Sequence, residues 1–483
     1  MSTPEEIQQN IAGLGHLING EIVRNEVSFG VVNPSTGKVE AEVPAATPEL
    51  LERAITAAEA ALPGWAATPE EERRAAIKRM GALTMEFLGP LNDLASIEKG
   101  NPMGAGEAFV IPGFADHMAD HPIPVDVLDD SPERTVKVVR KPIGVVAAIT
   151  PWNAPILISA EKIFSALLVG NTIVLKPSPF TPMAVLKLGE LFKDVVPPGV
   201  LNIVAGGDDI GRAMVEHPKT RMVSFTGSVA AGRAIAEVAG RQMKNVLCEL
   251  GGNDVAIVLP DVDLPAVAQE VFNSAFLMGG QVCAAIKRLY VHESIYDDMV
   301  AALADLATAT KAAPAEQGGT LVPLVTKPQY ERIKELVEDA VAHGAKAVAG
   351  GQAVTEYGGY FFEPTILTNV GPGVRVVDEE QFGPVLPVMA FSDVEDAIAA
   401  ANDSEYGLCG SVWTTDIAAG ERIAARLECG TAWVNHHADI DPAIPFGGVK
   451  NSGVGRSNGR PGLDAYAELQ TQIAYRSTAR AHA

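Results

Sequence analysis

Short apolar runs that end in turn residues recur through the first half of the chain and predict a sheet of parallel strands. Two runs lie within residues 134–149, and later runs at 172–175, 200–204 and 222–225 lead into turns rich in Gly, Pro or Ser. Helices are predicted between these runs, the first of them ending at Val169. Strands and helices that alternate at such short intervals predict an α/β fold with a doubly wound parallel sheet.

The flanking regions predict further elements. Turn signals at 17–21 and 33–37 indicate hairpins. Residues 47–97 show helical spacing, which Pro63 and the turn at 89–90 are expected to interrupt. A second α/β unit is expected over about 261–427, with helices near 263–278, 293–309 and 328–343, and the tail from 468 to 475 is predicted to be a strand that pairs outside its own domain.

Length, composition and charge limit the class of protein. With 483 residues the chain is too long for one simple core, so at least two domains are expected. The net charge of −23 argues against nucleic acid or an anionic membrane as a partner, because both would require clustered Lys and Arg. The most apolar run, 163–175, is broken by Gly170 and Asn171 and is too short to span a bilayer. The acidic N-terminus contains no apolar segment, so no secretory signal is expected and a cytoplasmic location is predicted.

Cys283 is a candidate nucleophile because it follows a glycine pair and a glutamine, in the segment Gly279-Gly280-Gln281-Val282-Cys283. The chain has four cysteines, and their spacing fits neither a disulfide framework nor a metal site. Glu249 lies 34 positions earlier (283 − 249) and opens the segment Glu249-Leu250-Gly251-Gly252. A thiol that attacks a carbonyl and a carboxylate that activates water are the two halves of covalent acyl-transfer chemistry. The alternative is a buried and unreactive cysteine.

Three polar residues directly follow predicted strands, where parallel sheets bind their ligands. Asn153 either donates its amide to a developing oxyanion or caps the next helix. Lys176 is either a solvated surface lysine or a contact to a ribose or phosphate. Ser228 opens a helix in the segment 227–232, where amide groups attract phosphate, although an ordinary helix cap has the same pattern. That segment matches neither the Gly-rich dinucleotide motif nor the Walker motif.

Two further features are interpreted without a catalytic role. Cys248 lies in strand-like sequence before Glu249 and is predicted to be structural. His436 and His437 are adjacent and lack a nearby pair of acidic ligands, so a loop at the rim of a cleft is favoured over a metal site. No metal is predicted.

Taken together, these segments resemble the aldehyde dehydrogenase superfamily over nearly the whole chain. The matching motifs occur in the family's order. They are Pro151-Trp152-Asn153, Lys176-Pro177-Ser178, Pro198-Gly199-Val200-Leu201-Asn202, Phe225-Thr226-Gly227-Ser228, Glu249-Leu250-Gly251-Gly252, Gly280-Gln281-Val282-Cys283, Glu379-Glu380-Gln381-Phe382-Gly383-Pro384 and Pro445-Phe446-Gly447-Gly448. So many matches in one order make a chance resemblance negligible.

The resemblance implies a fold of three parts and a homo-oligomer, either a dimer or a tetramer. Residues 1–250 would form a dinucleotide-binding domain, with 121–140 belonging to an oligomerisation arm. Residues 251–435 would form the catalytic domain, and residues 436–483 would return to the cofactor domain and complete the arm.

The resemblance also implies a mechanism and a cofactor, NAD or NADP. Cys283 would attack the aldehyde, Asn153 and the Cys283 amide would hold the oxyanion, and hydride would pass to the nicotinamide. Glu249 would then activate the water that hydrolyses the thioester. The implied cofactor-binding residues are Thr150, Pro151, Trp152, Lys176, Ser178, Pro179, Gly207, Phe225, Thr226, Gly227, Ser228, Leu250, Glu380 and Phe382. The implied substrate pocket consists of Ala154, Glu161, Val282, Ala284, His436 and Phe446.

Three positions depart from the family pattern. Pro179 stands where many members that prefer NAD have Glu, so NAD is expected to be preferred while NADP is also used. Ala154 and Glu161 stand where relatives often have Phe and Trp, which predicts a wider entrance and a bulky or ring-bearing aldehyde. A negative charge at Glu161 would discourage anionic substrates, unless this side chain turns outward to water or pairs with a basic group.

Two other functions remain as alternatives. A CoA-acylating enzyme would pass the acyl group to CoA, and such members often lack the glutamate that this chain retains as Glu249. A catalytically idle scaffold could use the same fold. The presence of Cys283, Glu249 and Asn153 argues against that scaffold.

Overall fold

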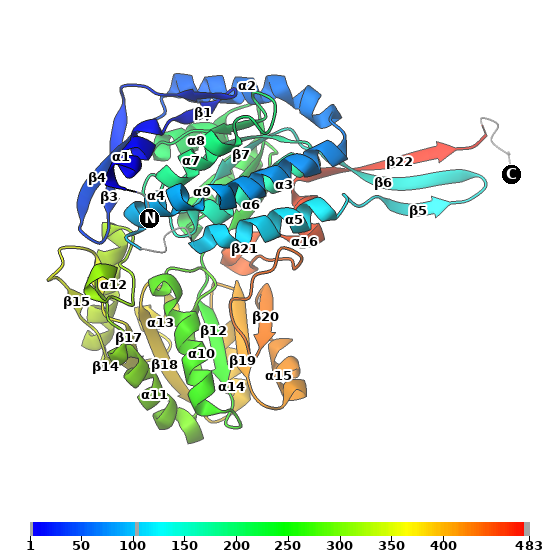
Figure 1. Cartoon of the computed structure of the whole chain (residues 1–483). Coiled ribbons are helices and arrows are strands. Elements are labelled where there is room, and N and C mark those ends of the chain that lie inside the picture. The colour runs from blue at the N-terminus through cyan, green and yellow to red at the C-terminus, as the bar shows by residue number, and fades with distance from the viewer. Residues whose placement is uncertain (1–2, 102–105, 478–483) are drawn as a thin grey trace.

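Two large sheets and one projecting arm organise the chain (Figure 1). The computed structural model describes residues 3–101 and 106–477, so the outermost residues of the predicted segments 1–250 and 436–483 lie outside the described residues. Within these ranges, no helix is long and apolar enough to cross a membrane.

The first sheet has eight strands in the order β2-β1-β9-β8-β7-β10-β11-β21. Its five central strands are parallel, as the sequence predicts. They are β7 (Val145–Ile149), β8 (Thr172–Lys176), β9 (Leu201–Ile203), β10 (Thr220–Thr226) and β11 (Asn245–Glu249), and the antiparallel edges are β1 (His16–Ile18), β2 (Glu21–Val23) and β21 (Gly453–Val454). The chain order runs outward from β7 through β8 to β9 and then continues on the other side with β10, so the order reverses between β7 and β10. A ligand crevice is expected at this switch point.

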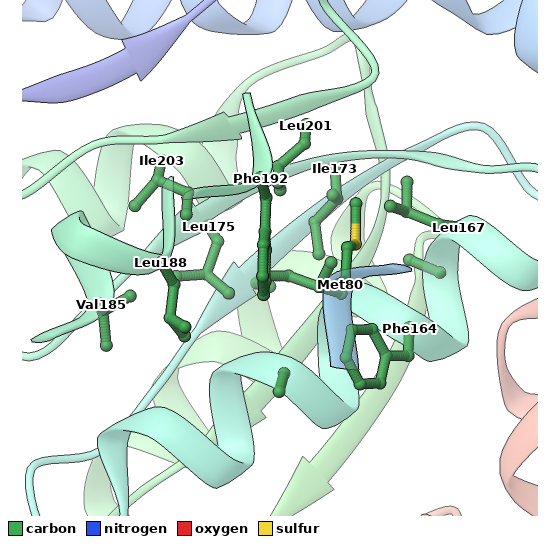
Figure 2. Close-up of a cluster of buried hydrophobic side chains, with 14 of the residues drawn as sticks. Met80, Phe164, Leu167, Ile173, Leu175, Val185, Leu188, Phe192, Leu201 and Ile203 are labelled. Atoms are coloured by element: carbon green, nitrogen blue, oxygen red, sulfur yellow. The ribbon is translucent and has the colours of Figure 1, made fainter. Parts of the chain in front are cut away.

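Helices on the faces of this sheet enclose the largest core. The helices of this half are α2 (Pro48–Ala67), α3 (Glu70–Glu86), α4 (Leu88–Lys99), α5 (Ile111–Asp120), α6 (Pro155–Val169), α7 (Met183–Phe192), α8 (Asp208–Glu216) and α9 (Val229–Arg241). Figure 2 shows Phe192 of α7 among Ile173 and Leu201 from the strands and Met80 from α3. All four side chains are buried, so this sheet rests on a continuous apolar layer.

The second sheet has seven strands in the order β14-β17-β18-β13-β12-β19-β20 and is parallel except for β14. Its strands are β12 (Asp254–Val258), β13 (Ile286–His292), β14 (Lys346–Ala349), β17 (Thr365–Thr368), β18 (Val385–Phe391), β19 (Cys409–Trp413) and β20 (Thr431–Val434). Its helices are α10 (Leu264–Phe276), α11 (Tyr296–Ala309), α12 (Lys327–Ala342), α14 (Val394–Asn402) and α15 (Ile417–Ala424). The three helices predicted here are confirmed to within a few residues.

The arm is a three-stranded antiparallel sheet that extends far from both large sheets (Figure 1). It consists of β5 (Asp126–Asp130), β6 (Arg134–Pro142) and β22 (Ala467–Tyr475). Every residue of β22 pairs with β6, which confirms the strand predicted at 468–475. The remaining elements are α1 (Pro4–Gly13), β3 (Ser28–Asn33), β4 (Lys38–Pro44), β15 (Ala353–Val354), β16 (Phe361–Phe362), α13 (Arg375–Asp378) and α16 (Gly459–Ala465).

The predicted hairpins are confirmed, but the interruption predicted at Pro63 is wrong. The turn between β1 and β2 places Asn19 and Gly20 at φ values of 53° and 80°, which favour these two residue types. Helix α2 continues through Pro63 to Ala67. The carbonyl left without its usual partner belongs to Glu59, which is exposed to water, and Trp65 anchors the last turn by donating from Nε1 to Leu167 O over 3.1 Å. The breaks fall instead between α2 and α3 and at Phe87.

Candidate active site

A cavity of about 640 Å³ lies at the carboxyl ends of β7, β8 and β10, at the switch point of the first sheet. Ten of the predicted cofactor-binding residues line it. They are Thr150, Pro151, Trp152, Lys176, Ser178, Pro179, Phe225, Thr226, Gly227 and Ser228. The structure therefore brings together residues from three separate loops, which supports their grouping into one ligand site.

The other four predicted cofactor residues are not part of the lining of this cavity. Gly207 is the N-cap of α8. Leu250 is buried and packs so closely against Gly232 that a side chain at position 232 would collide with it. The ring of Phe382 meets Trp152 edge-on, with the ring centroids 5.3 Å apart. The carboxylate of Glu380 accepts a hydrogen bond from the Gly252 amide over 2.9 Å.

The chemistry of the cavity fits a nicotinamide dinucleotide. Helix α9 begins at the cavity, and its first turn contains no acidic residue, so its amide end favours a phosphate. Ser228 both lines the cavity and caps α9, because its Oγ accepts a hydrogen bond from Ala231 N over 3.3 Å. Val215, Ile235 and Val238 supply an apolar wall of the kind that a flat base requires.

Two basic residues lie in this cavity, and the sequence indicated only one of them. Lys176 is buried, and its Nζ donates to Gly206 O over 2.9 Å, so the alternative of a solvated surface lysine is wrong. Burial lowers the pKa of Lys176 to about 8. Arg212 of α8 also lines the cavity. It lies in the middle of a helix, and no local pattern marked it as a cofactor contact.

Cys283 lies in the loop before β13 and packs against a small apolar cluster. The cluster contains Val282, Ala284 and Phe446, all predicted for the substrate pocket, and also Trp433, which the sequence did not indicate. Cys283 as a residue is partly exposed. Its thiol group is surrounded by protein, and this burial raises the pKa of the thiol to about 12. The thiol form therefore predominates before ligands bind. All four cysteines are free, and Cys248 is buried in the core, as predicted.

Asn153 contacts the loop that carries Cys283. Its Nδ2 donates to Gln281 O over 2.9 Å, two residues before Cys283. The N-cap of α6 is Ala154, without a side-chain cap, so the alternative role of Asn153 as a helix cap is wrong. An amide nitrogen carries two hydrogens. One of them is donated to the loop that carries Cys283.

Glu249 ends β11 and is buried beside Gly447. Neither of its carboxyl oxygens has a hydrogen-bond partner among the described residues. Its pKa is raised to about 8, first by burial and then by the negative charge of Glu161, while Lys162 and Arg456 act in the opposite direction. The charge of Glu249 also raises the pKa of the Cys283 thiol. A carboxyl group with this pKa suits a general base near neutral pH.

Glu161 points into the protein beside Glu249. Its Oε1 is shielded from solvent and makes no hydrogen bond within the described part of the chain, while the residue as a whole is half-buried. Burial raises its pKa, and the charge of Lys162 lowers it. Lys162 itself donates from Nζ to Ser224 Oγ over 2.9 Å. Ala154 is half-buried at the start of the same helix.

The two adjacent histidines have different environments. His436, predicted for the substrate pocket, is exposed. His437 is buried, its Nδ1 lies 2.9 Å from Ser411 Oγ, and burial lowers its pKa to about 3. Within the described ranges, no group of three His, Cys, Asp or Glu side chains is arranged to hold a metal ion.

The chain is similar to known proteins over nearly its whole length. Residues 22–472 match the model of the aldehyde dehydrogenase family. The chain is 37% identical over 481 residues to phenylacetaldehyde dehydrogenase from Pseudomonas fluorescens, covering 95% of each protein. It is 36% identical over 470 residues to lactaldehyde dehydrogenase from Escherichia coli K12, covering 95% of this chain and 97% of that protein. The NAD+ complex of an aldehyde dehydrogenase from Bacillus cereus matches the structure with a TM-score of 0.93 at 33% identity, covering 99% of both chains.

The chain therefore belongs to the aldehyde dehydrogenase family. It is an NAD(P)-dependent oxidoreductase that converts an aldehyde to the carboxylic acid. The predicted family, fold class, type of reaction and cofactor are confirmed.

Proposed function

We propose that Cys283, Asn153 and Glu249 carry out the oxidation. The observation that carries this assignment is the hydrogen bond from Asn153 to Gln281 O, which holds an amide donor beside the loop of Cys283. The Cys283 sulfur loses its proton to solvent and adds as the thiolate to the aldehyde carbon, and Asn153 together with the Cys283 amide stabilises the oxyanion. The C=O bond then re-forms as hydride leaves this carbon for the acceptor, and the product on Cys283 is a thioester. NAD or NADP, when bound in the cavity, supplies the hydride acceptor. Trp152, Phe382 and Glu380 would hold its nicotinamide half, and Lys176, Arg212 and the start of α9 its adenosine and phosphates.

Glu249 acts in the second half of the reaction. It takes a proton from water, whose oxygen attacks the thioester carbon, and the C–S bond then breaks to release the acid and regenerate Cys283. No side chain other than Glu249 is needed as a base for this step. A transfer to CoA would not need this base, so the buried and unpartnered carboxyl group of Glu249 favours hydrolysis.

The test of this assignment is Glu249→Gln, which keeps the shape but cannot accept the proton. Steady-state turnover should fall by about 10²–10⁴-fold, the usual contribution of a general base. A burst of one reduced nicotinamide per active site should survive, because hydride leaves before hydrolysis. The loss of both the burst and turnover would assign Glu249 to the attack step, and turnover that requires CoA would favour the acylating alternative.

We infer that the substrate is a neutral aldehyde with a bulky or aromatic group. Apolar side chains surround Cys283, among them Trp433 and Phe446. The small side chain of Ala154 at the start of α6 leaves room beside Asn153. Glu161 places a second carboxyl group near Glu249, which disfavours an anionic substrate. The relationship to phenylacetaldehyde dehydrogenase supports the same substrate class.

A panel of aldehydes, assayed by nicotinamide absorbance with NAD and with NADP, tests the substrate class. Phenylacetaldehyde should give a higher kcat/KM than acetaldehyde or lactaldehyde, and succinic semialdehyde should be the poorest substrate. In Glu161→Gln, kcat/KM should improve more for the anionic aldehyde than for a neutral one of similar size. Equal changes for both at low salt, where charges are least screened, would contradict the role of Glu161 in selectivity.

The arm supports a homo-oligomer, either a dimer or a tetramer, as the working form. Its outer strands carry apolar side chains that stay exposed in the single chain. Leu128 is 67% exposed, Leu469 56% and Ile473 55%. Exposed apolar patches of this kind mark protein–protein contacts. Division of the chain near residue 250 into a cofactor domain and a catalytic domain also remains our proposal, and the separate sheets support it.

A further inference from the structure

Lys287 is a buried amine at the base of the Cys283 loop, and the mechanism proposed above does not use it. It is the second residue of β13 and only 2% exposed. Its Nζ donates to Val282 O and Cys283 O over 2.7 Å each, and to Ala285 O over 3.3 Å. An ammonium group has three hydrogens. All three are directed at backbone carbonyls of the nucleophile itself and of its neighbours, so the loop folds around the Lys287 ammonium group.

The same amine lies beside the residues proposed to hold the nicotinamide. Its Nζ is 3.9 Å from Oε1 of Glu380 and 5.9 Å from the centre of the Phe382 ring. The Glu380 carboxylate is itself fixed by the Gly252 amide. Lys287 thus connects the loop that carries the sulfur with the two side chains that would orient the hydride acceptor. A shift of the loop would change the distance between the two reacting partners.

The charge of Lys287 acts on the Cys283 thiol. Burial raises the pKa of this thiol, and the negative charges of Asp254, Glu380 and Glu249 raise it further. Lys287 acts in the opposite direction and lowers the pKa. Because the thiolate is the reactive form of cysteine, a cation at this position increases the fraction of Cys283 that can attack.

We propose that Lys287 is a positioning residue for the oxidation, holding the Cys283 loop toward the nicotinamide site and stabilising the thiolate. The geometry explains why a costly buried ammonium stands at a position that a methionine could fill. Loss of the charge would leave only the negative charges of Asp254, Glu380 and Glu249 acting on the Cys283 thiol. Loss of the three hydrogen bonds would release the loop carbonyls at Val282, Cys283 and Ala285. The proposal rests on the assignment of Cys283 as the nucleophile.

The experiment compares Lys287→Met, which removes charge and donors, with Lys287→Arg, which keeps the charge. Lys38→Met, at an exposed position of β4, is the matched control. The rate of inactivation by iodoacetamide is measured from pH 6 to 10 without ligands, and peptide mapping identifies the labelled cysteine. At pH 8, Lys287→Met should be inactivated about tenfold more slowly than the wild type, and its inactivation rate should begin to rise at a higher pH. Lys287→Arg should keep the wild-type pH dependence of alkylation.

Steady-state kinetics separate positioning from charge. Both Lys287 variants should lose kcat, by about tenfold or more, with a smaller change in KM for NAD. A merely structural lysine would leave the alkylation profile unchanged in Lys287→Met, and that result would overturn the proposal. Should Lys287→Met fail to fold, as judged by circular dichroism, a displaced alkylation profile in Lys287→Arg would overturn the role of the charge. Activity that persists after complete labelling of Cys283 in the wild type would instead refute the proposed function itself.

Discussion

The proposed role of Glu249 as the base in hydrolysis predicts how turnover depends on pH. The pKa of Glu249 is about 8 because the carboxyl group is buried and faces the negative charge of Glu161. Only the ionised form can take a proton from water, so activity should rise with pH through this value. At pH 7 about 9% of such a group is ionised, and at pH 9 about 90%, so steady-state turnover should increase about tenfold between them.

The substitution Glu161→Gln changes this profile in a predictable direction. The like charge of Glu161 raises the pKa of Glu249, so its removal lowers that pKa. The rise in turnover should therefore move to lower pH, and turnover at pH 7 should increase. Glu21→Gln, an exposed carboxylate on β2, is the control and should leave the profile unchanged.

The assay measures the burst and the steady-state rate separately between pH 6 and 9.5, with saturating aldehyde and NAD. The pH effect of Glu249 should appear in the steady-state rate and not in the burst, because the burst reports the hydride transfer that precedes hydrolysis. A steady-state rate that stays flat across this range would refute the assignment of a base with a pKa of about 8. An unshifted profile in Glu161→Gln would show that its charge does not act on Glu249.

Four further outcomes are expected. Iodoacetamide should label Cys283 before the three other cysteines, with activity lost in proportion, because Cys248 and Cys409 are buried and the Cys429 thiol donates to Thr431 O, and peptide mapping checks this. Pro179→Glu should sharpen the preference for NAD, because a carboxylate accepts hydrogen bonds from the ribose hydroxyls of NAD and repels the 2′-phosphate of NADP. An unchanged ratio of kcat/KM for NAD and NADP would contradict the placement of Pro179 beside the adenosine ribose. Phe192→Ala should lower the free energy of unfolding by about 3–5 kcal/mol and shift the midpoint of urea unfolding to a lower concentration. Phe109→Ala, at a position that is 57% exposed, should leave that midpoint unchanged. Ile473→Asp should shift the oligomer toward smaller species in light scattering, and an unchanged mass would argue against the arm as the interface.

The sequence alone determined the fold class, the reaction and the candidate catalytic residues. Local patterns sufficed for the parallel strands, because each run is short, apolar and closed by turn residues, and strand geometry repeats over a few positions. The proposed catalytic residues Asn153, Glu249 and Cys283 lie at strand ends or in loops, within segments that resemble the family's motifs.

The tertiary structure decided everything that depends on contacts between distant segments. Pro63 stays within α2 because Trp65 is held by Leu167, more than a hundred residues away. His436 is exposed and His437 is buried. The two residues are adjacent and share the same sequence neighbourhood, so only the fold distinguishes their environments.

Arg212, Glu161 and Lys287 show the same limit at the site. Arg212 reaches the cofactor cavity because α8 packs beside the carboxyl ends of the strands. Glu161 acts on Glu249, and Lys287 on Cys283 and Glu380, through burial and charge in three dimensions. Electrostatic coupling depends on distance in space and on exclusion of water, and the one-dimensional order of residues contains neither quantity.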